Sequence, residues 1–167
     1  MKSTQLTSAL HASREHLFGS IRGLTEEQFR FVPAGETWCI AAQLAHLLRI
    51  ERAFAERARV ALTEDAPRME SASALNDDDH GLAQHLAVPQ IIHGMLNARR
   101  DLEDVIGRSD EATLARTLQH ERLGRMTIAD VMTRMAAHES EHAASIVKLG
   151  RQAPQSGRVI LPLIPRS

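Results

Sequence analysis

The sequence predicts an all-α protein, folded as a bundle of four helices. Apolar residues recur every three or four positions in four separate segments, which is the spacing of one face of an α-helix. Residues that start or stop helices bound these segments. No segment alternates cleanly between apolar and polar residues, and the best candidate for a strand, residues 158–164, is interrupted by Pro162.

The first half of the chain predicts two long helices with a short one between them. The apolar stripe of the first helix contains Leu6, Leu10, Leu17, Ile21 and Leu24. Residues 25–28 then match a capping box, which predicts a short helical turn, and residues 33–36 form a loop. The second long helix is predicted from Thr37, as its N-cap, to about Val60. Its charged residues are predicted to face solvent; they are Arg49, Arg52, Glu56, Arg57 and Arg59.

The second half of the chain predicts two more long helices. The third begins near Pro89, a residue tolerated in a first helical turn, and ends at Gly107, a typical C-terminal stop. The fourth opens at residues 127–130, which resemble a capping box, and ends at Gly150.

The connection between the second and third helices is long and acidic. It covers residues 61–88 and contains the run Asn-Asp-Asp-Asp at 76–79. A helix as long as the second spans about 35 Å, so a parallel third helix needs a long return of this kind. We therefore predict one four-helix-bundle domain over residues 1–150 with a crossover between helices 2 and 3. The alternative is a disordered loop. Residues 151–167 form a Pro-rich, extended tail, whose apolar run 159–165 is predicted to pack on the bundle or on a partner.

The composition excludes several classes of protein. The 167 residues carry a net charge of -1 and only 3% aromatic residues, which argues against nucleic-acid binding. No apolar stretch approaches the length that a bilayer requires, and the N-terminus lacks the apolar core of a signal peptide. We therefore expect no membrane partner and a cytoplasmic location. The single cysteine, Cys39, is interpreted as a small packed residue rather than a thiol of lowered pKa.

Nine histidines are the unusual feature of this plain composition. His138 and His142 are four residues apart and continue the predicted apolar stripe of the fourth helix, so both are expected to point into the bundle. Two buried imidazoles need polar partners, and one metal ion would satisfy both. A zinc site with an open position usually has three protein ligands, so we expect a third ligand on a facing helix.

The pattern alone leaves the third ligand open. His46, in the middle of the second helix, is the best candidate, and it ranks only somewhat above His93 in the third helix. The other histidines are predicted to lie on surfaces or in loops; they are His11, His16, His80, His85 and His120.

Residues 138–142 also match the pattern H-E-x-x-H of zinc metallopeptidases, in which Glu139 would be the general base. Two departures disfavour a peptidase. Ser145 and Lys148 stand where the elongated pattern requires glycine and histidine, and no Asp, Glu or His follows His142 to supply a downstream ligand.

Several short motifs together resemble the DinB/YfiT-like family of metal-binding four-helix bundles. They are residues 24–28, residues 38–40 leading to His46, Leu47 and Glu51, and residues 124–130 leading to His138, Glu139 and His142. The resemblance covers Leu6 to Gly150 and departs at Cys39, where the family commonly has serine. It implies an up-down-down-up bundle and a divalent metal ion, often zinc or nickel, held by His46, His138 and His142.

The resemblance and the sequence together support two functional hypotheses. The first is a metal-dependent enzyme acting on a small molecule, a thiol transferase or a hydrolase, with a low-molecular-weight thiol such as bacillithiol or mycothiol as cofactor. Glu139 and Glu141 are its candidate proton relays, although solvated positions are slightly favoured for both. The second is a non-catalytic stress-response or metal-binding module that acts by association, supported by the apolar tail and by the shortage of obvious substrate-binding residues. We also expect a homodimer.

Overall fold

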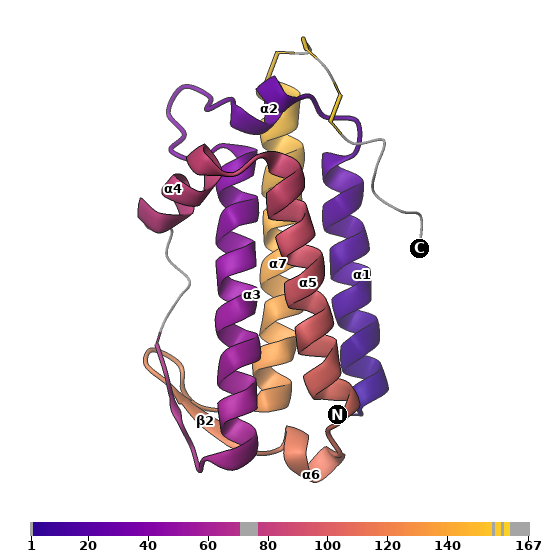
Figure 1. The fold of residues 1–167 in the computed structure, drawn as a ribbon, viewed down its shortest axis with the longest axis vertical. Coiled ribbons are helices and arrows are strands. Elements are labelled where there is room, and N and C mark those ends of the chain that lie inside the picture. Colours follow the sequence, from indigo (N-terminus) through magenta and orange to yellow (C-terminus); the bar gives the residue numbers. More distant parts are fainter. Residues whose placement is uncertain (1, 71–76, 155, 158, 161–167) are drawn as a thin grey trace.

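The four long helices form an up-down-down-up bundle, as predicted (Figure 1). The computed structural model describes residues 2–70, 77–154, 156–157 and 159–160. The long helices are α1 (Ser3–Ile21), α3 (Ile40–Thr63), α5 (Val88–Gly107) and α7 (Ile128–Gln152). Helix α1 packs along α7 and α3 packs along α5, and each of these pairs runs parallel.

Both predicted capping boxes form. Thr25 caps the short helix α2 (Glu26–Arg30), and Thr127 caps α7 through a hydrogen bond from the backbone N–H of Asp130. Helix α7 continues to Gln152, two residues beyond its predicted end. The prediction of Thr37 as the N-cap of α3 is wrong. The helix begins at Ile40, and the Sγ atom of Cys39 accepts the capping hydrogen bond from the N–H of Ala42 at 3.4 Å.

The crossover between α3 and α5 is structured over its described parts. It contains the strand β1 (Arg68–Met69) and the helix α4 (Asp77–His85), which packs against α3. The alternative of a disordered loop is therefore wrong for these segments, whereas residues 71–76 lie outside the described part of the chain.

A small sheet, which the sequence did not predict, closes one end of the bundle. Strand β1 pairs in parallel with β2 (Thr117–His120), and β2 pairs antiparallel with β3 (Gly124–Thr127), just after the short helix α6 (Glu111–Leu114). Strands of two to four residues are too short for an alternating pattern to stand out. The sheet ties the crossover to the connection that leads into α7.

The C-terminal tail packs on the bundle where it is described. Val159 forms an antiparallel bridge with Thr25, and the N–H of Ile160 donates to the carbonyl of Leu24 at 3.2 Å. The side chain of Ile160 contacts the apolar core. The rest of the predicted apolar run, residues 161–165, lies outside the described residues.

The apolar core is divided into two clusters along the bundle axis. One surrounds Leu17 and Leu44, and the other surrounds Leu10 and Met135. Four buried charged residues lie at the level between them; they are Arg14, Glu51, Arg99 and Glu139. Within the parts of the chain that the structure describes, none of the helices combines the length and the apolar character needed to cross a membrane.

Candidate metal centre

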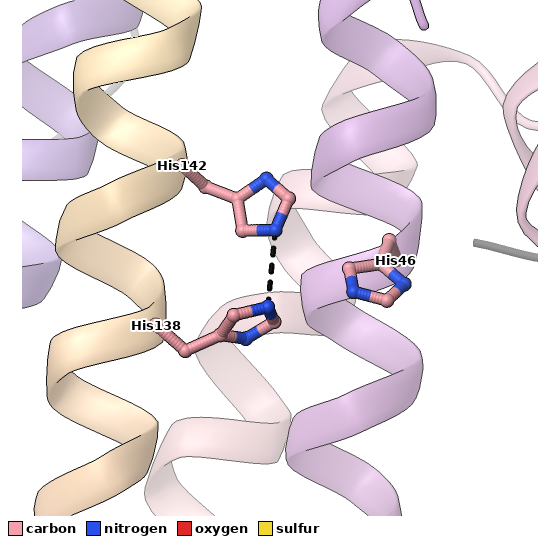
Figure 2. Close-up of side chains that lie close together, drawn as sticks. All are labelled: His46, His138 and His142. Carbon is pink, nitrogen blue, oxygen red and sulfur yellow. Dashed lines mark hydrogen bonds between the residues drawn. The ribbon is translucent and has the colours of Figure 1, made fainter. Parts of the chain in front are cut away.

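The structure brings the three predicted ligands together. His46 comes from α3, and His138 and His142 come from successive turns of α7 (Figure 2). One potential ligand atom from each ring lies within 4.8 Å of the other two. The Nε2 atoms of His138 and His142 are 3.2 Å apart. Two imidazole nitrogens bound to one tetrahedral zinc ion are about 3.3 Å apart, so this spacing suits shared coordination.

The histidines of α7 lie at the margin of the core rather than in it. His138 and His142 are half-buried, whereas His46 is fully buried. The buried stripe of α7 instead passes through Ala136, Glu139 and Ala143. The prediction that both histidines continue the core stripe is therefore wrong. The buried stripe is rotated about the helix axis by about one residue from the predicted one. This rotation turns the two rings toward α3 and leaves them accessible from one side.

Asp79 orients the ring of His46. Its Oδ2 atom is 3.0 Å from Nδ1 of His46, and its carboxylate also accepts two hydrogen bonds from Arg49, at 2.6 and 2.8 Å. Because a carboxylate only accepts, this contact favours a proton on Nδ1 of His46 and a lone pair on Nε2. Arg49, predicted to be a solvated charge, is thus part of the site. The sequence offered no signal that separated Asp79 from its neighbours Asp77 and Asp78.

Gln43 orients the ring of His142. The Nδ1 atom of His142 donates to Oε1 of Gln43 at 2.9 Å, and Nε2 of Gln43 donates to the hydroxyl of Ser145 at 3.0 Å. Nε2 of His142 therefore presents its lone pair toward His138. Trp38 contacts both His46 and His142, with ring centroids 5.3 and 5.8 Å away.

All three histidines are held neutral. Burial lowers the pKa of His46, although the neighbouring Asp79 carboxylate opposes this effect. Burial, followed by the proximity of His46, lowers the pKa of His138. Burial and the two other imidazoles lower the pKa of His142 to about 3. Neutral imidazoles are the form that binds metal ions, so no proton needs to be removed near neutral pH.

The metal-free protein should lose stability as the pH falls from 7.5 to 5. The unfolded chain protonates His142 near its ordinary pKa of 6.5, whereas the folded chain keeps it neutral down to about 3. The unfolded state therefore binds more protons within this window, and the free energy of unfolding falls by about 2 kcal/mol from this residue. Urea denaturation with a chelator present measures the loss. A His142→Asn variant with an equally large pH-dependent loss would contradict this assignment.

The donor set fits a divalent transition-metal ion. Nε2 of His46 is buried and has no hydrogen-bond partner among the described residues. A buried polar atom without a partner is costly, and a metal ion bound between the three rings would supply one. Neutral imidazole is a good ligand for zinc, nickel, copper and iron.

Glu139 belongs to a buried ionic network and not to the histidine site. Its carboxylate accepts hydrogen bonds from Ser13 at 2.5 Å, Arg14 at 2.6 Å and Arg99 at 3.0 Å. The same two arginines also bind Glu51, each at 2.5 Å. Burial lowers the pKa of Arg99, but the carboxylates of Glu51 and Glu139 outweigh this effect and hold the pKa above its ordinary value. The prediction of a solvated Glu139 is therefore wrong. Because its carboxylate already pairs with two arginines, Glu139 is not available as the general base of a peptidase.

The remaining histidines lie away from this cluster. His93, the alternative third ligand, is exposed and contacts Asn97. His11 and His16 are exposed on α1, as predicted, and His11 pairs with Glu103 at 2.8 Å. His120 is buried, contrary to its predicted surface position, because its Nδ1 atom accepts the backbone N–H groups of a tight turn.

Comparison with known families agrees with this architecture. A profile of the DinB superfamily matches residues 9–146. The chain belongs to the DinB superfamily. A search among curated proteins found no match.

Solved structures share this DinB fold at low sequence identity. YfiT from Bacillus subtilis, described as a probable metal-dependent hydrolase with an unusual four-helix bundle topology, matches with a TM-score of 0.75 and 14% identity over 89% of this chain and 86% of YfiT. A mycothiol-dependent maleylpyruvate isomerase matches with a TM-score of 0.73 and 12% identity over 87% of this chain, which spans 61% of the isomerase. The four-helix bundle protein TT2238 matches with a TM-score of 0.63 and 17% identity, over 86% of this chain and 95% of TT2238.

Proposed function

We propose that this DinB protein binds one divalent transition-metal ion through the Nε2 atoms of His46, His138 and His142. The observation that carries the proposal is the cluster of three imidazoles, whose ligand atoms all lie within 4.8 Å of one another. The unsatisfied Nε2 atom of His46 supports the same proposal. We favour zinc or nickel, which both accept imidazole ligands. The likeness to YfiT, described as a probable metal-dependent hydrolase, is consistent with this choice.

A cavity beside the histidines suits a small molecule. It has a volume of about 240 Å³ and is lined by Glu36, Trp38, Gln43, Glu141, His142 and Ser145. Pockets for drug-sized ligands are typically larger, at about 300–1,000 Å³. The Trp38 ring provides an apolar wall next to two of the histidines, and the other lining groups are polar. We therefore infer a compact, polar substrate.

We further propose a metal-dependent reaction of this small molecule, either transfer of a thiol or hydrolysis. When bound, the divalent ion would act as a Lewis acid and lower the pKa of a thiol or a water molecule. Asp79 and Gln43 accept the ring protons of His46 and His142, which keeps both Nε2 lone pairs available. The exposed Glu141 lines the cavity and can accept a proton there. A low-molecular-weight thiol as cofactor draws support from the mycothiol-dependent structural neighbour.

An activity screen tests this proposal. The protein is loaded with zinc or nickel and incubated with low-molecular-weight thiols and electrophiles, and separately with hydrolysable esters and amides. We expect a conjugate or a hydrolysis product that needs the metal, disappears in His142→Ala and persists in His93→Ala, which changes an exposed histidine. If the metal-loaded protein forms neither product, the enzyme hypothesis fails and the non-catalytic metal-binding module remains.

The second hypothesis gains no support from the described tail. Ile160 contacts the core of its own chain, so this part of the apolar run is not presented to a partner. The homodimer stays a prediction.

A further inference from the structure

Asp79 reaches the candidate metal centre from outside the four long helices. It lies in α4, the helix of the crossover, yet its side chain is fully buried against α3. Its Oδ2 atom contacts Nδ1 of His46 at 3.0 Å and Nη2 of Arg49 at 2.8 Å. The crossover therefore contributes a carboxylate that touches a candidate ligand.

Two groups compete for the same nitrogen of His46. Nδ1 lies 3.0 Å from Oδ2 of Asp79 and 3.3 Å from Nη2 of Arg49. A carboxylate can only accept a hydrogen bond from this nitrogen, and a guanidinium can only donate one to it. A single ring nitrogen of a neutral imidazole cannot satisfy both. The shorter contact with Asp79 favours a proton on Nδ1, whereas Arg49 alone would favour a lone pair there.

The outcome of this competition decides what the other ring nitrogen can bind. With the proton on Nδ1, Nε2 has a lone pair for a metal ion. With a lone pair on Nδ1, the proton lies on Nε2 and blocks coordination. Histidine ligands of metal ions generally donate their second N–H to a carboxylate, a carbonyl or water, which fixes the tautomer in this way.

We propose that Asp79 is a positioning residue that selects the metal-binding tautomer of His46 against the opposite tautomer that Arg49 would impose. This inference rests on the proposed metal site. Arg49 has a double role, since it holds the Asp79 carboxylate with two hydrogen bonds and becomes an inhibitory donor when that carboxylate is absent.

The test combines tautomer and affinity measurements on four forms of the chain. These are the wild type, Asp79→Ala, Asp79→Asn and the double variant Asp79→Ala/Arg49→Met. Long-range ¹⁵N–¹H correlation spectra of the metal-free proteins identify the protonated nitrogen of His46. Competition with a chromophoric chelator measures zinc affinity.

We expect the Nδ1–H tautomer in the wild type and the Nε2–H tautomer in Asp79→Ala, with zinc affinity lowered about 10- to 100-fold. Asp79→Asn retains an acceptor oxygen and should lose less zinc affinity than Asp79→Ala. The double variant should bind zinc about tenfold more tightly than Asp79→Ala, because the competing charged donor is gone. A purely structural role of Asp79 predicts no such recovery, since the double variant has fewer contacts between α3 and α4.

The inference is overturned if His46 keeps the Nδ1–H tautomer in Asp79→Ala, or if the double variant binds zinc no better than the single one. If the wild type does not bind zinc, the proposed function is overturned instead. The tautomers of the metal-free proteins still show whether Asp79 controls the ring of His46, so the two failures can be told apart.

Discussion

Replacing Glu139 with alanine should lower the free energy of unfolding by about 3–5 kcal/mol. The side chain is fully buried, and its carboxylate accepts hydrogen bonds from Ser13, Arg14 and Arg99. Its removal leaves two buried guanidinium groups that, among the described residues, pair with Glu51 alone. Such a loss is a large share of the about 5–15 kcal/mol that stabilises an ordinary domain.

Urea denaturation, monitored by circular dichroism, measures this effect. The matched control is Glu141→Ala, which removes an exposed glutamate two residues along the same helix and should change the stability by less than about 0.5 kcal/mol. Equal denaturation midpoints for Glu139→Ala and the wild type would show that the buried network does not stabilise the bundle.

His46→Ala should abolish stoichiometric metal binding, with a loss of affinity of more than about 100-fold. His46 is the only candidate ligand that α3 supplies within the described cluster, so its removal leaves two ligands from one helix. His138→Ala and His142→Ala should act similarly. Added zinc should also raise the melting temperature of the wild type and not that of the variants, because a ligand that binds the native state stabilises it.

His93→Ala is the control for this series, since His93 is exposed and lies outside the cluster. Metal content after dialysis and the melting temperature in zinc and in chelator are the two measurements. A His46→Ala protein that keeps one ion per chain would show that His46 is not a ligand.

The helices could be predicted because their signals are local. The apolar spacing and the capping residues Thr25 and Thr127 lie within a few positions of the helix ends that they define. The sheet could not be predicted, because its strands have two to four residues and its pairing joins the crossover to the approach to α7. The true cap of α3 was missed because Cys39 accepts through sulfur, a residue type that is not among the preferred caps.

The site could be predicted in part. The spacing of His138 and His142 placed both on one side of a helix, but the choice of His46 over His93 came from the family resemblance. The buried face of α7 was misjudged because a glutamate counts as polar in any pattern. Its partners Arg14 and Arg99 are 125 and 40 residues away, so no local pattern indicated that it would be buried. Asp79 was missed for the same reason, since His46 is 33 residues away.

X-ray absorption spectroscopy of the protein loaded with one equivalent of zinc or nickel identifies the atoms that coordinate the ion. We expect one tightly bound ion per chain, with a shell of imidazole nitrogens at about 2.0–2.1 Å for zinc. A chain that binds no ion would contradict the proposed three-histidine site. So would a shell containing sulfur at about 2.3 Å, which would make Cys39 a ligand that the three-histidine site does not include.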